Sequence, residues 1–426
     1  MRTVARSLAP ALAVAPLLLA SLVQPAGAAG RPGQLPDADD AVLSGWAVLA
    51  ADTFVPGSEP SGYFRTPQVV FPGQPVQGFS GVHALADGSL LAMSDNGFGS
   101  RTNSQDYVLR VHQVVPDTAS GELDVVGGFD LSDPDRLVPW PIWRDGGCAA
   151  EAALPAGYTC PAADRRLTGW DFDIESMQVA PDGTFWFGEE FGPFLLHTDA
   201  GGRLLQPPVP TPGVKAPQNP TLAPGEQPNL GGSKGFEGMA ISPNGTTLRA
   251  MLEGPVAEDV AAGRTSDLRV YDVRVRRNGP VFTGDFARYR LEDPAHAIGD
   301  FVAVNAVQFL VIERDNASGA AAAFKRVYLV DRRDRDGDGY LDKHLLVDLM
   351  DLANPDGLGL TGEDPFTFPY VTIEDVELLD ADTIVVLNDN NYPGGGGRGP
   401  QSDVTEYLEI DLGGPLAVDA RLLPRG

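Results

Sequence analysis

Acidic side chains stand at both ends of a predicted β-hairpin between Thr168 and Pro193. Asp182-Gly183 is the turn signal, because these two residue types favour the tight turns that join antiparallel strands. Glu175 lies on the first predicted strand, and Glu189-Glu190 end the second. A hairpin folds back on itself, so we expect these carboxylates near the same end. Such carboxylates repel one another unless a cation or a base lies among them, which indicates metal binding or acid–base chemistry.

The same layout recurs along the chain. In three units the turn Asp or Asn stands 7 residues after Ser80, Glu175 or Glu237. A fourth copy runs from Ile373 to Asn390, and a partial one runs from Gln308 to Val330. Repeated hairpins are typical of a propeller or another repeated β-sheet array. In a propeller the innermost strands line a central channel, so equivalent positions far apart in sequence converge at one mouth.

We therefore predict a metal centre at that mouth. Ca²⁺ prefers about six to eight oxygen ligands, which a ring of carboxylates can supply. The candidates are the acids that begin or end the predicted inner strands, namely Asp95, Glu175, Glu189, Glu190, Glu237, Glu253, Glu313, Glu374 and Asp389. Among them, Glu175, Glu237 and Glu374 are expected to be metal ligands or the general base. The alternative is that each acid caps a turn or accepts backbone N–H groups.

Basic residues stand beside these acids. Lys234 directly precedes the Gly235-Phe236-Glu237-Gly238 motif and is the best candidate to hold a phosphate or carboxylate group of a substrate. The further candidates are Arg101, Arg249, Arg314 and Lys325. The alternative is charge balance.

A second candidate for Ca²⁺ is the run from Asp334 to Asp342, which follows the first nine positions of a calcium loop. Gly339 permits the sharp turn, but the twelfth position is Leu345 and not the bidentate Glu of an EF-hand. We predict a structural Ca²⁺ loop, and the alternative is an acidic solvated turn. The predicted ligands are Asp334, Asp336, Asp338, the carbonyl of Tyr340, and Asp342.

The N-terminus has the features of an exported protein. Arg2 and Arg6 precede an apolar run and a small-residue site after Ala28, which predicts a secretory signal peptide over residues 1–28. Cys148 and Cys160, as a pair in an exported chain, predict a disulfide. The net charge of −27 disfavours nucleic acid and anionic membranes, and no later stretch is apolar enough to span a bilayer. We expect a secreted monomer.

Short strands separated by turns dominate, with 50 Gly and 37 Pro, so we predict an all-β fold. A flexible lead-in over residues 29–40 would precede one β-propeller-like domain over 41–426, with an insertion at 131–167. Five to seven blades fit the spacing, and six are favoured. One outer strand is expected at Gly202–Leu205. Val404–Leu412 is a late strand that could close the ring by joining the first blade.

The motifs also resemble a family of secreted bacterial proteins, the esterase-like activity of phytase family. The matching stretches are Gly78–Gly81 with Ser94–Gly97, Asp173–Ser176 with Trp186–Pro193, Lys234–Ala240 with Glu253, Val311–Asp315, and Ile373–Asp375 with Asn388–Asn390. Ser176 departs from the pattern, because Gly is the commoner residue after the Glu. The resemblance implies a β-propeller-like domain and hydrolysis of esters, phosphate esters among them.

These observations predict a Ca²⁺-dependent hydrolase that acts on a small phosphoric or carboxylic ester. A bound Ca²⁺ would polarise the phosphoryl or carbonyl oxygen and activate water. Two alternatives stay open. The first is a non-catalytic extracellular binding propeller in which Ca²⁺ is purely structural. The second is a lactonase-like propeller that favours uncharged cyclic esters.

Overall fold

The computed structural model describes residues 35–63, 69–148, 154, 158–277 and 279–424. The predicted signal peptide and the first half of the lead-in lie outside the described residues. The described end of the lead-in is ordered, contrary to expectation. Ala38–Asp40 form a 3₁₀ helix beside β19 (Asp342–Asp348), and the ring Nε2 of His344 lies 2.7 Å from the carbonyl oxygen of Pro36.

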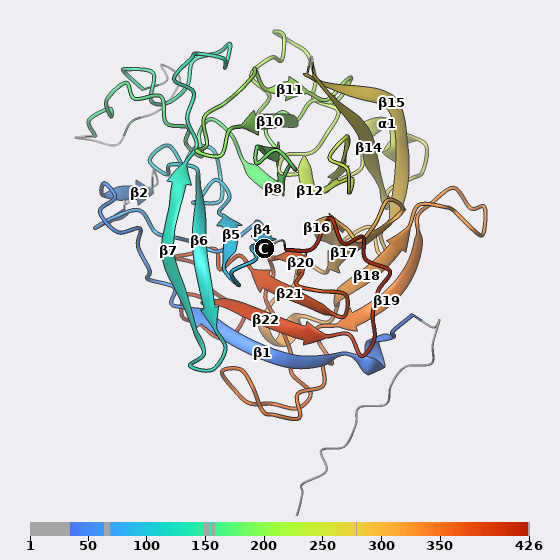
Figure 1. Ribbon diagram of the computed structural model, residues 1–426. Helices are drawn as coiled ribbons and strands as arrows, with labels where there is room; N and C mark the ends of the chain where they lie inside the picture. The colour runs from blue at the N-terminus through green and yellow to red at the C-terminus, as the bar shows by residue number, and fades with distance from the viewer. Residues whose placement is uncertain (1–34, 64–68, 149–153, 155–157, 278, 425–426) are drawn as a thin grey trace, which may run out of the picture.

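Antiparallel strands build five units of four, arranged around a common centre (Figure 1). The first unit is β4 (Gly81–Ala84), β5 (Leu90–Met93), β6 (Arg110–Asp117) and β7 (Glu122–Asp130). The second is β8 (Ile174–Val179), β9 (Phe185–Glu189), β10 (Phe194–Thr198) and β11 (Val209–Pro210). The third is β12 (Phe236–Ile241), β13 (Thr247–Leu252), β14 (Asp267–Arg276) and β15 (Gly279–Arg290). The fourth is β16 (Ala297–Ala303), β17 (Gln308–Arg314), β18 (Lys325–Asp331) and β19.

The fifth unit joins both ends of the domain. It consists of β20 (Ile373–Leu378), β21 (Thr383–Asn388), β22 (Thr405–Asp411) and the N-terminal strand β1 (Val42–Leu49). β1 pairs antiparallel with β22 along its length. Val404–Leu412 therefore takes part in closing the ring as predicted, but it belongs to the last blade. It meets the first blade only through β1, which pairs with β7 at Val48 and Glu122.

The five first strands pack against one another in a closed cycle, β4 to β8, β12, β16, β20 and back to β4. This is the arrangement of a β-propeller, which confirms the all-β propeller prediction. Among the described residues there are five such blades and not the six that we favoured. The strand predicted at Gly202–Leu205 is also wrong, since Val209–Pro210 supplies the outer strand of the second blade and Leu204 makes only an isolated bridge to Thr198.

The predicted Asp-Gly and Asn-Gly turns join the first and second strands of three blades. Gly88, Gly183 and Gly245 have φ of +86°, +81° and +69°, a region that glycine enters without steric cost. Asp182 Oδ1 accepts hydrogen bonds from the backbone N–H and hydroxyl of Thr184. These local contacts fix the hairpin register and therefore the positions of the acids at the opposite ends of the strands.

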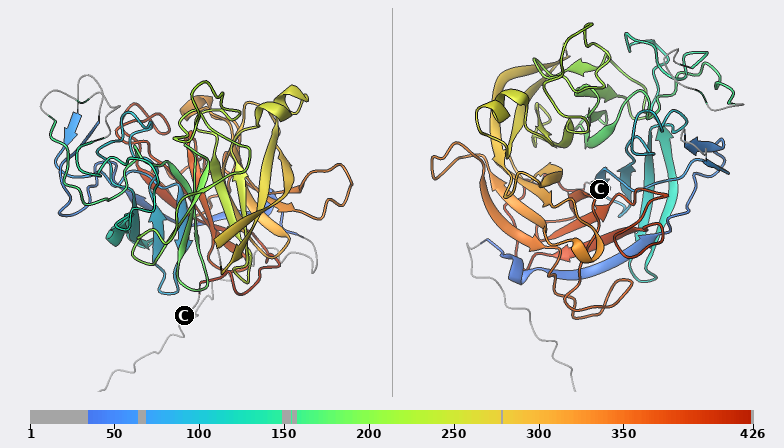
Figure 2. Two further views of the ribbon diagram at one scale, coloured as in Figure 1. Left: turned by 90° about the horizontal axis from the view of Figure 1, so that it is seen from above. Right: turned by 180° about the vertical axis from the view of Figure 1, so that it is seen from behind.

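Several smaller elements lie outside the five blades. β2 (Ser61–Tyr63) and β3 (Val69–Phe71) form a separate two-stranded sheet, and in Figure 2 β2 lies on the face opposite the chain's C-terminal end. The insertion between β7 and β8 carries the predicted disulfide, Cys148–Cys160, which the structure confirms. The short helices are α1 (Ala257–Ala261) and the 3₁₀ turn Gly319–Ala321. Among the described residues no helix has the length and hydrophobicity needed to cross a membrane.

Candidate metal centre at the channel mouth

A β-bulge near the start of the first strand of a blade places an acid toward its neighbours. The register of β8 with β9 shifts between Ile174 and Ser176, so Glu175 is the extra residue. The same shift isolates Glu237 on β12 and Glu374 on β20. A bulge redirects the side chain at that position away from the regular alternation of the sheet. The three acids therefore occupy one structural position in three blades.

The fourth blade has the same bulge but no acid. The shift between Ile298 and Asp300 isolates Gly299, and a Cβ there would lie 1.8 Å from the carbonyl oxygen of Ile373. Only glycine fits this close approach of two backbones. The first blade carries Ser80 at the corresponding place, just before β4. Its hydroxyl donates a hydrogen bond of 3.0 Å to Glu374 Oε2.

A second layer of charged residues lies at or just after the end of the second strand of each blade. In chain order these are Asp95, Glu190, Glu253, Arg314 and Asp389. The fourth blade thus places a cation where each of the others places a carboxylate. Arg314 is 5% exposed, and its Nη2 lies 3.2 Å from Glu374 Oε1, 3.6 Å from Glu253 Oε1 and 3.7 Å from Glu237 Oε1. One buried guanidinium therefore links carboxylates of two other blades.

Two groups of three carboxylates form within these layers, each with ligand atoms within 4.8 Å of one another. We name Asp95, Asp173 and Glu175 the first triad and Glu190, Glu237 and Glu253 the second triad. Asn96 holds the first triad in place, since its Nδ2 donates a hydrogen bond of 2.7 Å to Asp173 Oδ1. In the second triad the N–H of Gly235 donates to Glu190 Oε1 at 3.0 Å, and Lys234 Nζ pairs with Glu253 Oε2.

The triads are strained electrostatically when no cation lies among them. Burial, followed by the charge of Asp173, raises the pKa of Asp95 to about 8. Burial raises the pKa of Glu374 to about 8 against the opposing effect of Arg314, and it raises that of Asp389 to about 7 with a contribution from Asp95. The pKa values of Glu175, Glu190 and Glu237 are all well above the ordinary value, through burial first and neighbouring carboxylates second.

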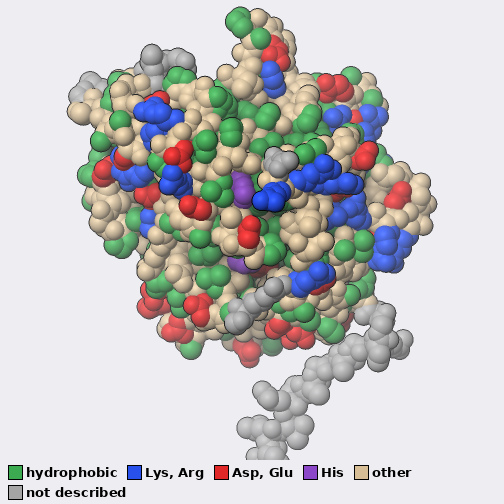
Figure 3. Space-filling view, turned by 45° about the horizontal axis from the view of Figure 1, so that its top comes forward, with side chains coloured by type: hydrophobic (Ala, Val, Ile, Leu, Met, Phe, Trp, Pro, Cys, Tyr) green, Lys and Arg blue, Asp and Glu red, His purple; other side chains and the backbone are tan. Residues whose placement is uncertain are grey.

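Cations offset only part of this repulsion. Burial opposes the charged form of Lys234, but the neighbouring carboxylates, Glu253 first and then Glu190 and Glu237, together outweigh it, so the pKa of the lysine is raised. The same balance raises the pKa of Arg314, with Glu374 as its strongest partner. On the exterior face in Figure 3, acidic and basic side chains are interspersed, and basic ones gather toward the right-hand side. Two of the three groups of converging carboxylates among the described residues are the triads.

Two of the predicted ligands outside the triads have structural partners of their own. Glu189 accepts hydrogen bonds from the N–H groups of Phe191, Gly192 and Phe194, as the turn-capping alternative expected. Glu313 accepts from the Tyr289 hydroxyl at 2.6 Å and pairs with Lys343 at 2.7 Å. Each is the strand residue paired with the one before the bulge, so its side chain is directed away from the position that Glu190 or Arg314 occupies.

Asp173 is a member of the first triad that we did not predict as a site residue. It lies two residues before Glu175, and the Asp-x-Glu spacing was a visible signal. Arg314 was only a general candidate for anion binding. Of the other basic candidates, Arg249 pairs with Asp272 at 3.1 Å and Lys325 with Asp315 at 2.7 Å, and neither pairs with an acid of the triads.

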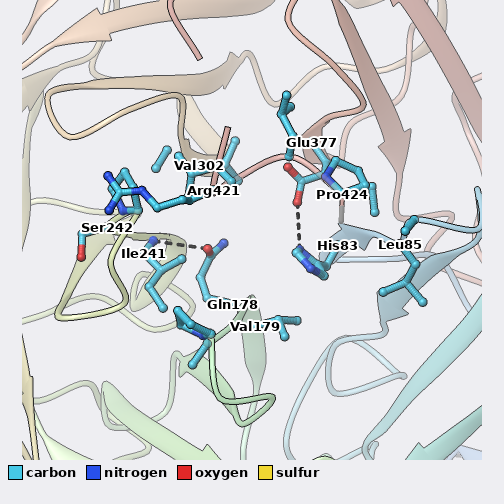
Figure 4. Close-up of a pocket in the computed structure, with 18 residues that line it drawn as sticks. His83, Leu85, Gln178, Val179, Ile241, Ser242, Val302, Glu377, Arg421 and Pro424 are labelled. Carbon is cyan, nitrogen blue, oxygen red and sulfur yellow. Dashed lines mark hydrogen bonds and ion pairs between the residues drawn. The ribbon is translucent and has the colours of Figure 1, made fainter. Parts of the chain in front are cut away.

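The opposite ends of the inner strands form a different environment. There His83, Gln178 and Glu377 line a pocket of about 250 Å³ together with Arg421 and Pro424 of the C-terminal segment (Figure 4). His83 Nδ1 lies 3.3 Å from Glu377 Oε2, and Gln178 Oε1 accepts from the N–H of Ile241. Because Gln178 lies near the end of β8 and Glu175 near its start, the triads lie at the other mouth of the channel.

The predicted calcium loop is an exposed turn between β18 and β19. Carboxylate oxygens of Asp334, Asp336 and Asp342 lie within 4.8 Å of one another, and Asp334 Oδ1 is buried without a hydrogen-bond partner. Asp338 lies outside this group and forms an ion pair of 3.5 Å with Arg290, and its role as a ligand stays a prediction. The Tyr340 hydroxyl donates to Asp267, and its role through the carbonyl stays a prediction.

We expect Asp336→Asn to remove one Ca²⁺ from the stoichiometry measured by isothermal titration calorimetry. The reason is that three converging carboxylates are a minimal oxygen site and the amide removes one charge. Hydrolytic activity should stay within about two-fold of wild type, because residues that act at a separate site behave additively. Asp356→Asn, at an exposed acid outside the loop, is the control. An unchanged stoichiometry would identify the loop as a solvated acidic turn.

Comparison with protein families agrees with this architecture. A family model described as phytase-like, with esterase-like activity of phytase, matches residues 74–392. The chain belongs to this phytase-like family. The matched region extends from before Ser80 to beyond Asp389, so it contains both triads, Lys234 and Arg314. An uncharacterized secreted protein of Arthroderma benhamiae is 24% identical over 194 residues, which cover 38% of this chain and 37% of that relative's length.

Solved structures with a similar course of the chain are distant in sequence. A protein of unknown function from Dyadobacter fermentans is 11% identical with a TM-score of 0.37, covering 87% of this chain and 99% of that one. Regucalcin from Agrobacterium tumefaciens, a calcium-binding protein, is 12% identical with a TM-score of 0.36, covering 86% and 97%. The PQQ-bound aldose sugar dehydrogenase of Streptomyces coelicolor is 12% identical with a TM-score of 0.35, covering 84% and 82%. These scores are low, so the propeller assignment rests on the sheet topology.

Proposed function

We propose that this phytase-like protein is a secreted, metal-dependent ester hydrolase whose active site is the channel mouth. The observation that carries the proposal is the pair of buried carboxylate triads beside Arg314 and Lys234. Buried carboxylates that only stabilise a fold are paired or fully hydrogen-bonded. Here many acids face few cations, which is costly for stability and typical of a functional site.

The donor set fits Ca²⁺. Its oxygens are hard ligands, they come from several blades, and they offer enough carboxylates for one ion at each triad. The first triad would hold one ion, and the second triad would hold another. Glu374 and Asp389, which adjoin the triads, would complete the oxygen ligands. When bound, Ca²⁺ supplies Lewis-acid polarisation of an ester oxygen and lowers the pKa of water.

The chain's own residues then have distinct roles. Lys234 and Arg314 place positive charge beside the acids, where they would hold the negative charge that develops on the ester oxygen. Glu374, which accepts a hydrogen bond from Ser80, is placed to take a proton from attacking water. The water oxygen bonds to the carbonyl carbon or phosphorus, the bond to the ester oxygen breaks, and the leaving alcohol receives the proton. Glu175 and Glu237 remain ligands in this scheme.

A second candidate function is a non-catalytic binding propeller with structural Ca²⁺. The observation in its favour is that Arg314 already pairs with three carboxylates, as in a purely structural ion-pair network. In either case we propose a small-molecule ligand and an exported monomer, since the disulfide and the secreted relative are consistent with an extracellular protein.

The deciding experiment is hydrolysis by the purified protein of a phosphomonoester, a phosphodiester, phytate, a short acyl ester and a lactone. Each reaction is run in excess Ca²⁺ and after chelation. We expect turnover of one bond class that chelation abolishes. If no substrate is turned over while Ca²⁺ still raises the melting temperature, the binding propeller is correct.

A further inference from the structure

We infer that a cleft beside the channel mouth binds a neutral, largely aromatic group of the ester, so that the substrate is an aryl carboxylic ester and not a polyphosphate. The inference rests on the proposed function and names its substrate class. The cleft has a volume of about 530 Å³ and lies between the insertion that carries Cys148 and the loop around Gln218. Clefts of this size hold small ligands.

Two walls of the cleft continue directly into the triads. Trp170 lies three residues before Asp173 of the first triad, and its carbonyl accepts a hydrogen bond of 2.9 Å from Arg101 Nε. On the other wall, Asn219 Nδ2 donates a hydrogen bond of 2.7 Å to the carbonyl of Gly192, two residues after Glu190 of the second triad. Short stretches of backbone therefore join both walls of the cleft to the triads.

The lining is mixed, and its largest side chains are two indole rings. Trp140 and Trp170 lie in it, with Ile142 and Leu222 among the aliphatic side chains. Trp140 is held by a stacked contact with Phe194, with ring centroids 5.2 Å apart, and Trp170 packs on Trp143 at 5.4 Å. Indole rings fixed by neighbours offer large contact area at little entropic cost, and they prefer aromatic or other ring-shaped partners.

Two polar atoms in this lining have no hydrogen-bond partner among the described residues. They are the donor Trp170 Nε1, on a side chain that is 5% exposed, and the acceptor Gln218 Oε1. A buried polar group without a partner costs free energy, so such a pair indicates a ligand that supplies an oxygen acceptor and a hydroxyl donor. A hydroxylated aromatic ring satisfies both.

The charge of the cleft excludes a highly anionic ligand. Its charged side chains are one base, Arg101, and one acid, Asp145. The guanidinium of Arg101 lies 4.3 Å over the Trp170 ring, and Asp145 pairs with Arg165 and Arg136. A polyphosphate such as phytate would require several Lys or Arg side chains to neutralise it. The cleft has one, so a neutral ring is the better complement.

The test compares methyl acetate, methyl benzoate, methyl 4-hydroxybenzoate, phenyl acetate and phytate in excess Ca²⁺, with each kcat/KM divided by the rate of hydroxide-catalysed hydrolysis. We expect the aryl esters to exceed methyl acetate by at least about 10-fold, as one well-buried ring contributes. Trp140→Ala should raise KM for the preferred aryl ester about 10-fold and leave methyl acetate unchanged. Trp170→Phe should selectively weaken the hydroxylated ester. Trp46→Phe, in β1 far from the cleft lining, is the control.

A binding readout separates this inference from the proposed function. Methyl 4-hydroxybenzoate is titrated into the protein while tryptophan fluorescence is followed, with and without chelator. If no ester is hydrolysed but the ligand still binds and Trp140→Ala weakens binding, the cleft is retained and catalysis is rejected. Equal normalised rates for aryl and small esters, or an equal effect of Trp140→Ala on both, would contradict the inference that the cleft binds an aromatic group. So would phytate as the preferred substrate.

Discussion

Glu237→Gln is expected to lower Ca²⁺-dependent hydrolysis by about 10²–10³-fold, the loss typical of removing one preorganised electrostatic contact. Glu237 is the bulge residue of β12, belongs to the second triad, and lies 3.7 Å from Arg314. Glu253 of the same triad lies 3.6 Å from Arg314, but it also pairs with Lys234, whereas Glu237 occupies the bulge position. Glu175→Gln, at the same bulge in the preceding blade, should show a loss of similar size.

Two controls make this result specific. Glu363→Gln makes the same chemical change at an exposed acid and should leave kcat/KM unchanged. The melting temperature of Glu237→Gln in chelator should equal or exceed that of wild type, because the amide removes one charge from a group of mutually repelling carboxylates. Full activity in Glu237→Gln and Glu175→Gln together would place the reaction outside the channel mouth.

Variants at Glu237 and at Glu374 distinguish a metal ligand from a base. If Glu237 holds Ca²⁺, raising the Ca²⁺ concentration should recover much of the lost activity, because only affinity is weakened. If Glu374 is the base, Glu374→Gln should not be recovered by Ca²⁺ and should lose the acidic limb of the pH–rate profile. The two outcomes assign roles that the geometry of the triads alone leaves equivalent.

The hairpins could be predicted from the sequence because their signals are local. Period-two alternation and an Asp-Gly or Asn-Gly turn determine each hairpin within about twenty residues. The turns at Gly88, Gly183 and Gly245 confirm this. The repeated register then correctly grouped Glu175, Glu237 and Glu374, which lie more than 60 residues apart but occupy one bulge position.

The fourth blade was misread for a physical reason. Its first strand, β16, has Gly299 at the bulge, where no side chain fits against Ile373, and its second strand ends in Arg314. Without an acid as a marker, we took Gln308–Arg314 for the first strand of a unit, and Glu313 then seemed equivalent to a channel residue. Alignment of the ends of the second strands would have placed Arg314, rather than Glu313, beside Glu253 and Asp389.

Ring closure and blade number depend on contacts that no local pattern encodes. β1 pairs with β22 although the two strands lie at opposite ends of the chain. The outer strand of the second blade is only Val209–Pro210, too short to give a periodic signal. Bulges are likewise invisible to a period-two pattern, so the one-residue difference between Glu189 and Glu190 could be resolved only when the register was known.

In chelator, we expect the melting temperature to fall as the pH rises from 6.5 to 8.5. Burial and neighbouring acids raise the pKa of Asp95 to about 8 and that of Asp389 to about 7. Burial raises the pKa of Glu374 to about 8 despite the opposing charge of Arg314. In the unfolded chain these groups titrate near about 4. Between the unfolded and the folded pKa values, the folded state binds more protons than the unfolded state. Stability is therefore lost as the pH rises through the folded pKa values.

Ca²⁺ should reverse this trend, because it binds the ionised carboxylates that otherwise repel one another. At a free concentration of about 100 times Kd, binding to the folded state alone adds about 2.7 kcal/mol, on the order of 5 °C in melting temperature. The increment should be largest at pH 8.5 and smallest at pH 6.5, where protons compete for the same oxygens. Burial lowers the pKa of His112 to about 3, so this histidine destabilises the fold only below its unfolded pKa of about 6.5 and stays outside the window.

The measurement is a series of thermal melts across this pH range, with Ca²⁺ and with chelator, for wild type, Asp336→Asn and the double variant Glu190→Gln with Glu237→Gln. Asp336→Asn should keep the pH-dependent increment, since its loop is exposed and separate from the channel. The double variant should lose the part of the increment that the second triad contributes, because two of its three carboxylates no longer ionise, while the first triad keeps its own part. A Ca²⁺ increment that Asp336→Asn abolishes and the double variant preserves would place the stabilising ion in the surface loop, and the acids of the channel mouth would then have to be held by protons and by Arg314 alone.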